Sequence, residues 1–151
     1  MAFADLRETV DALRERGRLI EVEEEVRAAH EAAAVLAVAG DQDRGAVFFR
    51  RIAGHRVPVV GNVVCGREVL GWALGVAEAQ VAEELGRRIS RPMDPVPAAD
   101  APVLEETGAD GVPLERLFPI LTHHGSDSAP YITTGLVSAV DPETGNPARG
   151  I

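Results

Sequence analysis

The chain contains no lysine, because all 15 of its basic residues are arginines. A Schiff base needs a lysine amine, so this sequence excludes covalent chemistry with pyridoxal phosphate or with carbonyl substrates. It also excludes a P-loop, whose lysine reaches the phosphates of a nucleotide. The one cysteine, Cys65, excludes internal disulfides, a Cys-rich zinc site, a CxxC redox pair and a four-cysteine iron–sulfur site.

Long hydrophobic runs are also missing. No stretch approaches the roughly 18 consecutive apolar residues of a membrane helix, and the first residues lack a signal-peptide pattern, so we expect a cytoplasmic protein. The 151 residues are 46% hydrophobic and 26% charged, which is typical of a globular domain with a core of its own. A net charge of −9 argues against nucleic acid or an anionic membrane as the main partner.

Charge and proline divide the chain into unlike parts. Residues 1–91 hold 15 acidic residues and 13 arginines, whereas residues 92–151 hold 9 and 2. Nine of the ten prolines follow Arg91. A long connection without periodicity usually marks a linker or a functional loop. We therefore predict a first domain over residues 1–91, a proline-rich linker or wrapping arm over 92–115, and a different unit over 116–151.

The first part predicts a mixed α/β layer domain, because helical and strand patterns alternate along it. Leu6, Val10 and Leu13 recur at helical spacing, and Gly17 follows as an end signal. Similar patterns predict helices over residues 5–16, 30–39, 67–74 and 78–89, and strands over residues 18–23, 46–50 and 57–63. Gly40 is expected to end the second helix.

The last part predicts a β-hairpin. Residues 131–140 are rich in strand-forming side chains, and Asp141-Pro142-Glu143-Thr144-Gly145 has the composition of a turn. The second strand is expected to begin near Asn146. Because an isolated hairpin is only marginally stable in water, we expect its partner strands to come from another chain or from a longer form of this one.

Reactive side chains are densest over residues 122–135. His123 and His124 are adjacent, so extended backbone points them to opposite faces and they do not easily share a metal ion. We interpret this stretch as a polar loop with one histidine packed and one exposed. A Ser-His-Asp triad is disfavoured, because three members within five residues rarely form the relay and no G-x-S-x-G elbow is present. Hydroxyls and backbone N–H groups that bind a phosphate or a flavin edge remain an alternative.

Other reactive residues have structural interpretations. The acidic run over residues 21–25 indicates a solvated strand, not a site for a hard cation. Trp72 lies at helical spacing from Val69 and Val76, which favours a place in the core, and Cys65 is expected to act as a small buried hydrophobe. His30 and His55 show no evident chemistry.

Several segments, in order and with similar spacing, resemble the start of a UbiD-type decarboxylase. They are Asp5-Leu6-Arg7 through Gly17-Arg18-Leu19, Pro58-Val59-Val60-Gly61-Asn62 with Gly66-Arg67-Glu68, Phe118-Pro119-Ile120, Thr122-His123-His124, Asp127, Pro130-Tyr131-Ile132-Thr133 and the turn at residues 141–145. The PYIT and DPETG segments together carry most of the specificity. The resemblance spans nearly the whole chain.

The resemblance implies a fold and an activity. UbiD-type enzymes begin with a small α/β domain, continue into a split β-barrel like that of flavin reductases, and end in an oligomerisation domain. The expected class is therefore α/β (α+β), with residues 116–151 forming the first strands of an incomplete barrel. The family carboxylates or decarboxylates aromatic or α,β-unsaturated acids with prenylated FMN, a divalent metal (Mn²⁺ or Mg²⁺) and K⁺.

The resemblance also places individual residues. It puts the Thr134 hydroxyl near the flavin and makes Arg149, Gly150 and Ile151 cofactor-lining residues. Ala148 stands where the family has a metal-binding asparagine, so no metal ligand is assigned. The catalytic arginine and both catalytic acids would follow Ile151, so no catalytic residue is assigned and the chain alone is expected to be inactive.

Two further hypotheses stay open. In one, the chain is an accessory or structural subunit that completes its barrel with a partner polypeptide. In the other, it is a stand-alone module that binds flavin or phosphate. The resemblance itself implies a small carboxylic acid as substrate and a homo-oligomer of the parent protein.

Overall fold

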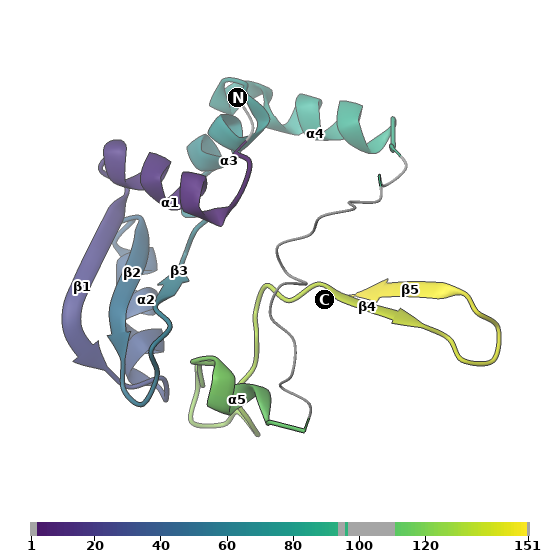
Figure 1. Ribbon diagram of the computed structural model, residues 1–151. Helices are drawn as coiled ribbons and strands as arrows, with labels where there is room; N and C mark the ends of the chain where they lie inside the picture. Colours follow the sequence, from purple (N-terminus) through teal and green to yellow (C-terminus); the bar gives the residue numbers. More distant parts are fainter. Residues whose placement is uncertain (1–2, 94–95, 97–110, 151) are drawn as a thin grey trace.

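The chain forms a three-stranded sheet flanked by helices, and a separate two-stranded hairpin (Figure 1). The computed structural model describes residues 3–93, 96 and 111–150. Its elements are α1 (Leu6–Glu15), β1 (Leu19–Val26), α2 (Glu31–Asp41), β2 (Ala46–Ile52), β3 (Val59–Gly61), α3 (Arg67–Leu74), the 3₁₀ turn η1 (Glu78–Gln80), α4 (Val81–Ile89), α5 (Leu114–Leu117), β4 (Val137–Val140) and β5 (Pro147–Gly150). The predicted order of elements over residues 1–91 is confirmed.

The three-stranded sheet has the order β1–β2–β3, with β1 and β2 parallel and β3 antiparallel to β2. Helix α2 connects the two parallel strands and lies against one face of the sheet (Figure 1). The main core forms between them, where Val47, Phe49 and Ile52 of β2 are at most 1% exposed. Such a layer buries the apolar side of the strands, as the alternation in residues 18–23 predicted.

A second core cluster joins α1 and α3 to the sheet. Leu13 of α1, Ala46 of β2 and Val69 of α3 form it, and Cys65 and Trp72 pack against it. The Arg16 guanidinium also lies 4.7 Å from the centre of the Trp72 ring. The interpretation of Trp72 and Cys65 as packing residues is confirmed, although both are only partly buried.

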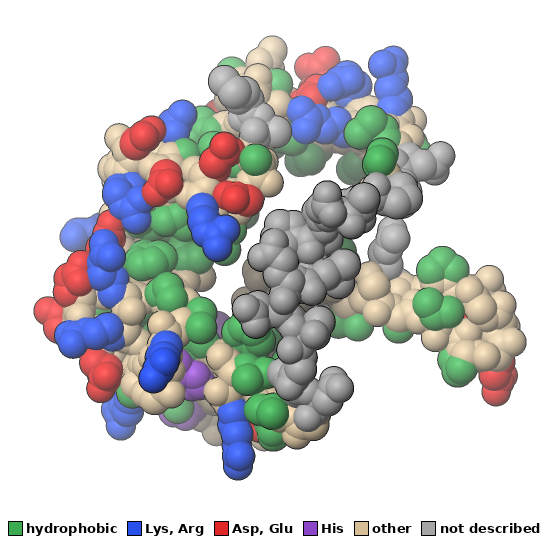
Figure 2. Space-filling model, viewed as in Figure 1, with side chains coloured by type: hydrophobic (Ala, Val, Ile, Leu, Met, Phe, Trp, Pro, Cys, Tyr) green, Lys and Arg blue, Asp and Glu red, His purple; other side chains and the backbone are tan. Residues whose placement is uncertain are grey.

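Two acidic residues of β1, Glu21 and Glu23, pair with arginines. Glu21 accepts a hydrogen bond from Arg14 Nε at 2.7 Å and also pairs with Arg50, which contacts Glu23 at 2.6 Å. The hydrogen bond from Arg14 is the main reason that the pKa of Glu21 is lowered. Figure 2 shows acidic and arginine side chains gathered over α1 and β1. The interpretation of this run as a solvated strand is confirmed.

Helix α2 passes through Gly40 and ends at Asp41, so the prediction that Gly40 ends it is wrong. The left-handed residue is Asp43 (φ 50°), and Arg44 N–H returns to the Ala39 carbonyl at 2.8 Å. Gly40 itself has no positive φ, and a Cβ there would make only ordinary contact with the Asn62 amide nitrogen at 3.7 Å, so the helix continues through this position. Asp43, whose carboxylate pairs with Arg18 at 2.8 Å, thus takes the left-handed position that glycine usually has after a helix end.

Two other predictions differ from the structure, and one short helix was not predicted. The strand expected over residues 57–63 pairs only over Val59–Gly61, because Asn62 turns the chain with φ 55°. The strand expected over residues 131–140 is confined to β4, since Tyr131 N–H bonds to the Leu121 carbonyl at 3.2 Å instead of a neighbouring strand. The short helix α5, which begins after Pro113, was not anticipated. Most of the expected linker lies outside the described residues.

The predicted hairpin is confirmed, with β4 and β5 antiparallel and Val140 opposite Pro147. The Asp141 carboxylate accepts from Glu143 N–H at 2.8 Å and from the Thr144 hydroxyl at 2.8 Å. Gly145 supplies the positive φ of 71° that closes the turn. The flanking Val137 and Val140 are 63% and 65% exposed, so neither face of the hairpin is covered within the described residues.

Within the described ranges, none of the helices combines the length and the apolar character needed to cross a lipid bilayer.

An ion-pair cluster on α4 predicts a pH-dependent contribution to stability. Hydrogen bonds from Arg87 and then Arg88 lower the pKa of Glu84 from 4.5 to about 2. A carboxyl group with a lowered pKa in the folded state stabilises the protein above its unfolded pKa, and that contribution is lost as the pH falls toward 2. We expect an NMR titration of the Glu84 carboxyl carbon to have its midpoint near 2. A midpoint near 4.5 would contradict the cluster, and the Glu84→Gln variant should lack this pH dependence.

Candidate functional site

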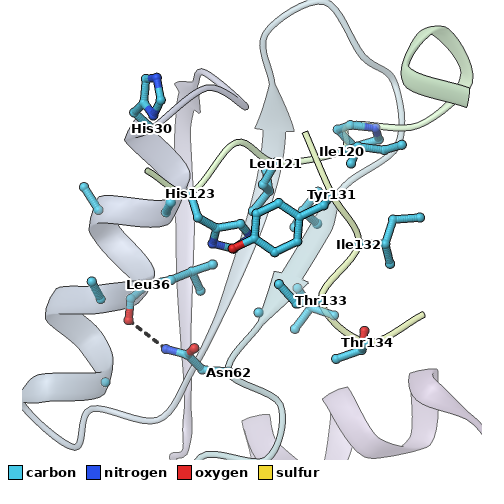
Figure 3. A pocket seen from close by; sticks show the side chains of 18 of the residues that line it. His30, Leu36, Asn62, Ile120, Leu121, His123, Tyr131, Ile132, Thr133 and Thr134 are labelled. Carbon is cyan, nitrogen blue, oxygen red and sulfur yellow. Dashed lines mark hydrogen bonds between the residues drawn. The ribbon is translucent and has the colours of Figure 1, made fainter. Parts of the chain in front are cut away.

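The candidate site is a groove of about 1210 Å³ between α2, β3 and residues 118–134. Its walls are mostly apolar, and polar side chains from residues 30–62 and 118–134 lie among them (Figure 3). A large concave surface of this kind, with a few convergent polar groups, is the usual form of a binding site. The described polar side chains along it are His30, Asp41, Asn62, His123, His124, Tyr131, Thr133 and Thr134.

Small residues of α2 and the edge strand β3 form one side of the groove. The side of α2 that faces the groove carries small residues, namely Ala33, Ala37 and Gly40. Gly61 has no side chain, so the Leu36 side chain packs directly on the β3 backbone. Asn62 Nδ2 donates to the Leu36 carbonyl at 2.8 Å, which fixes the amide between the helix and the strand. The helix and the strand therefore hold this wall in place without a charged side chain.

Residues 121–131 form the opposite side as a closed loop. The Asp127 carboxylate accepts from the N–H groups of His123 and His124 at 3.1 and 2.7 Å. Asp127 N–H returns to the His124 carbonyl at 3.1 Å, and Tyr131 N–H bonds to Leu121. Asp127 thus satisfies backbone donors and is not a partner of a histidine ring.

His123 and Tyr131 pack against each other in the groove. Their ring centres are 5.0 Å apart and the planes are tilted by 42° (Figure 3). His123 is half-buried, whereas His124 is exposed. This confirms the interpretation of a loop with one histidine packed and one exposed. In the part of the chain that the structure describes, no group of three His, Cys, Asp or Glu residues is arranged to hold a metal ion.

Two of the residues that the resemblance assigned to the cofactor are described by the structure with their surroundings. Thr134 lines the groove just before β4, and Gly150 of β5 is opposite Val137 at the same end of the hairpin. Arg149 is opposite Ser138 in the backbone pairing. The Arg149 side chain and Ile151 lie outside the described residues.

The two described residues are compatible with a flat ring system such as a flavin. The Thr134 side chain is exposed and free to turn its hydroxyl toward a ligand. At Gly150, a Cβ would meet nothing within 4 Å, so the backbone there can be approached closely. Ala148 is opposite Ala139 in β5, and its methyl group offers no ligand to a metal.

Comparison with known families decides the relationship of the chain. Residues 10–89 match the N-terminal domain of 3-octaprenyl-4-hydroxybenzoate carboxy-lyase, named UbiD_N, and residues 94–151 match the Rift-related domain of the same enzyme, named UbiD. The chain belongs to the UbiD family. The resemblance that its sequence segments carry is therefore confirmed.

UbiD relatives match over most of the chain. A protein of Rhodospirillum rubrum, "Uncharacterized protein in cooM 5'region", is 39% identical over 95% of the chain and 31% of its own length. The phenolic acid decarboxylase of Sedimentibacter hydroxybenzoicus is 30% identical over 93% of the chain and 31% of its own length.

A solved UbiD-class structure has a similar fold. It is an evolved dimeric form of HmfF from Pelotomaculum thermopropionicum in complex with prFMN, with a TM-score of 0.83 and 32% identity over 97% of the chain and 34% of its own. The chain thus spans about a third of the length of these UbiD relatives.

Sequence reasoning missed several groove residues of this UbiD chain. It recognised the Gly61-Asn62 pair only as part of a family pattern, although Asn62 joins α2 to β3. It also placed Tyr131 in a strand, whereas Tyr131 packs on His123. The Thr-His-His segment contains His123 and the PYIT segment contains Tyr131. Because both segments belong to the resemblance, they could have indicated that the two rings lie together.

The Asp127 contacts predict a local effect of substitution. Asp127→Ala removes the acceptor of two backbone N–H groups, so we expect faster hydrogen exchange at His123 and His124 and a loss of about 1 kcal/mol of stability. Amide exchange followed by NMR measures this effect. Ser126→Ala in the same exposed turn is the matched control and should leave both exchange rates unchanged. Equal exchange rates in the two variants would contradict the role of Asp127.

Proposed function

We propose that the chain is the N-terminal portion of a UbiD-like decarboxylase that acts on an aromatic or α,β-unsaturated carboxylic acid with prenylated FMN. The observation that carries this proposal is the match of both consecutive UbiD family models to residues 10–89 and 94–151. The HmfF structure with prFMN supports the cofactor, and the phenolic acid decarboxylase supports the substrate class. The parent protein would then be a carboxy-lyase.

The chain's own residues would bind and orient the cofactor. Thr134 would donate its hydroxyl to the flavin, while Arg149, Gly150 and Ile151 would line it along the end of β5. Open space beside the Gly150 backbone supports this arrangement. When bound, the modified flavin supplies the electron sink for the carbon–carbon bond change, so the protein's part is orientation, proton donation and exclusion of water.

A divalent metal (Mn²⁺ or Mg²⁺) and K⁺ would belong to the parent protein. The described residues of this chain offer no cluster for them, and Ala148 lacks a ligating atom. Ligands from the rest of a UbiD-length polypeptide would have to hold these ions.

We further propose the division into a first domain over residues 1–91, a linker or arm over 92–115 and the first strands of a split β-barrel over 116–151. The two exposed edges of the β4–β5 pair support it, because a two-stranded sheet needs more strands or a packed helix for stability. The dimeric HmfF relative supports a homo-oligomer of the parent. Location in the cytoplasm stays a prediction.

Two preparations test the proposed function. The chain alone, mixed with prenylated FMN and a panel of aromatic and α,β-unsaturated acids, should release no CO₂. A chimera in which residues 1–151 replace the matching third of HmfF should bind the cofactor and release CO₂ from an acid of the panel. Turnover by the isolated chain would contradict its predicted inactivity. A folded, flavin-loaded chimera without turnover on any acid would contradict the family activity.

A further inference from the structure

The corner between the end of β1 and the start of α2 receives a distant segment of the chain. Thr122 forms a parallel bridge with Ala29, about ninety positions earlier in the sequence. Thr122 N–H donates to the Ala28 carbonyl at 3.2 Å, and His30 N–H donates to the Thr122 carbonyl at 2.9 Å. Backbone hydrogen bonds thus join this segment to residues 28–30, in the way that an added strand pairs with a sheet edge.

One side chain of this segment enters the main core. Leu121 is 8% exposed and belongs to the same cluster as Phe49 and Ile52 of β2. Pro119 beside it is also buried, whereas Leu114 in the same part of the chain is 55% exposed. Leu121 therefore serves as the apolar anchor of the segment, and the neighbouring backbone bonds set its register.

The receiving corner has an unusual backbone. His30 has a φ of 66°, which side chains other than glycine rarely adopt, and its side chain makes no capping hydrogen bond. A residue keeps such a conformation only where its surroundings hold it there. The bond from His30 N–H to Thr122 is one of the contacts that hold it.

We propose that the docking of Leu121 at this corner couples the three-stranded sheet and the groove-forming residues 118–134 into one cooperative unit. Residues 92–117 separate the two parts in sequence, so without the anchor the groove wall would not share the stability of the sheet. A consequence is that any molecule bound in the groove stabilises the sheet by mass action. The inference does not depend on the proposed function, because it concerns packing within this chain.

Two residues that occur once each allow a direct test. Trp72 reports on the first part through its fluorescence, and Tyr131, labelled as 3-fluorotyrosine, reports on the groove wall through one ¹⁹F signal. The full chain is unfolded in urea and both probes are followed. Coincident midpoints are the mark of one cooperative unit. A Tyr131 midpoint below that of Trp72 in the unsubstituted chain would overturn the proposal.

The anchor itself is tested by Leu121→Ala, with Leu114→Ala as the matched control for an exposed leucine. We expect the Tyr131 midpoint of Leu121→Ala to fall by about 1 M urea or more and to separate from that of Trp72. The control should keep both midpoints together and unchanged. An unchanged Tyr131 midpoint in Leu121→Ala would overturn the proposal. A common fall of the Tyr131 and Trp72 midpoints would also overturn it, because contacts other than Leu121 would then maintain the coupling. If Leu121→Ala does not fold, Leu121→Val gives the same comparison with a smaller shift.

Discussion

Replacing Phe49 with alanine is expected to lower the free energy of unfolding by about 3–5 kcal/mol. Phe49 is 0% exposed in the middle of β2 and packs in the cluster that joins the sheet, α2 and Leu121. Truncation removes the burial of an aromatic ring and leaves a cavity that close-packed neighbours only partly fill. Domains of this size are stable by about 5–15 kcal/mol, so a large share of the total would be lost. Urea unfolding followed by Trp72 fluorescence measures the change.

Phe48 provides the matched control because it is the same residue type one position earlier on the same strand. It points to the other face, is only half-buried, and has the Arg50 guanidinium 5.7 Å from its ring centre. Phe48→Ala should therefore cost clearly less than Phe49→Ala, about 1–2 kcal/mol. Equal losses for the two variants would show that α2 does not cover the face of β2 that carries Phe49.

The Gly45→Ala substitution is expected to destabilise the fold by about 3 kcal/mol or more. Gly45 has a φ of 101°, and an added Cβ would collide with the Arg18 carbonyl group, whose carbon would lie at 2.8 Å. That backbone is not free to move aside. The Arg18 carbonyl accepts from Ala46 N–H at 2.9 Å, and the Arg18 side chain bonds to Asp43 at 2.8 Å. Conformational strain and a backbone collision therefore act together.

Gly54→Ala separates the two causes. Gly54 also has a positive φ, 80°, but a Cβ there would meet nothing within 4 Å. The free energy of unfolding that Gly54→Ala loses should therefore reflect backbone strain alone, about 1–2 kcal/mol. Thermal or urea unfolding of both variants measures the difference. If Gly45→Ala destabilised the fold no more than Gly54→Ala, the result would contradict the close approach of Gly45 to the Arg18 backbone.

The candidate site could be predicted from the sequence only in part. The resemblance named Thr134 and Gly150, and the structure places Thr134 on the groove and Gly150 opposite Val137 in the hairpin. The sequence did not indicate that Leu121 enters the main core or that His123 packs on Tyr131. Contacts between residues distant in sequence leave no periodic pattern in either segment, so propensity and spacing cannot reveal them.

Local physical chemistry in the sequence determined most of the elements. The apolar spacing of Leu6, Val10 and Leu13 predicted α1, the alternation after Arg18 predicted β1, and the turn at residues 141–145 predicted the hairpin. The segments shared with UbiD-type enzymes also determined the family, which the two matching models confirm. These features depend on neighbours in the chain, and short-range patterns record them.

Only the tertiary structure decided where the elements end and what lies beside them. It carried α2 through Gly40, because Asp43 makes the left-handed turn after the helix and Arg18 holds Asp43 there. Residues 131–136 do not join the expected strand, because Tyr131 bonds to Leu121 and packs on His123. The physical reason is the same in each case. Tertiary contacts between residues far apart in the chain outweigh local preferences of about 1 kcal/mol or less per residue.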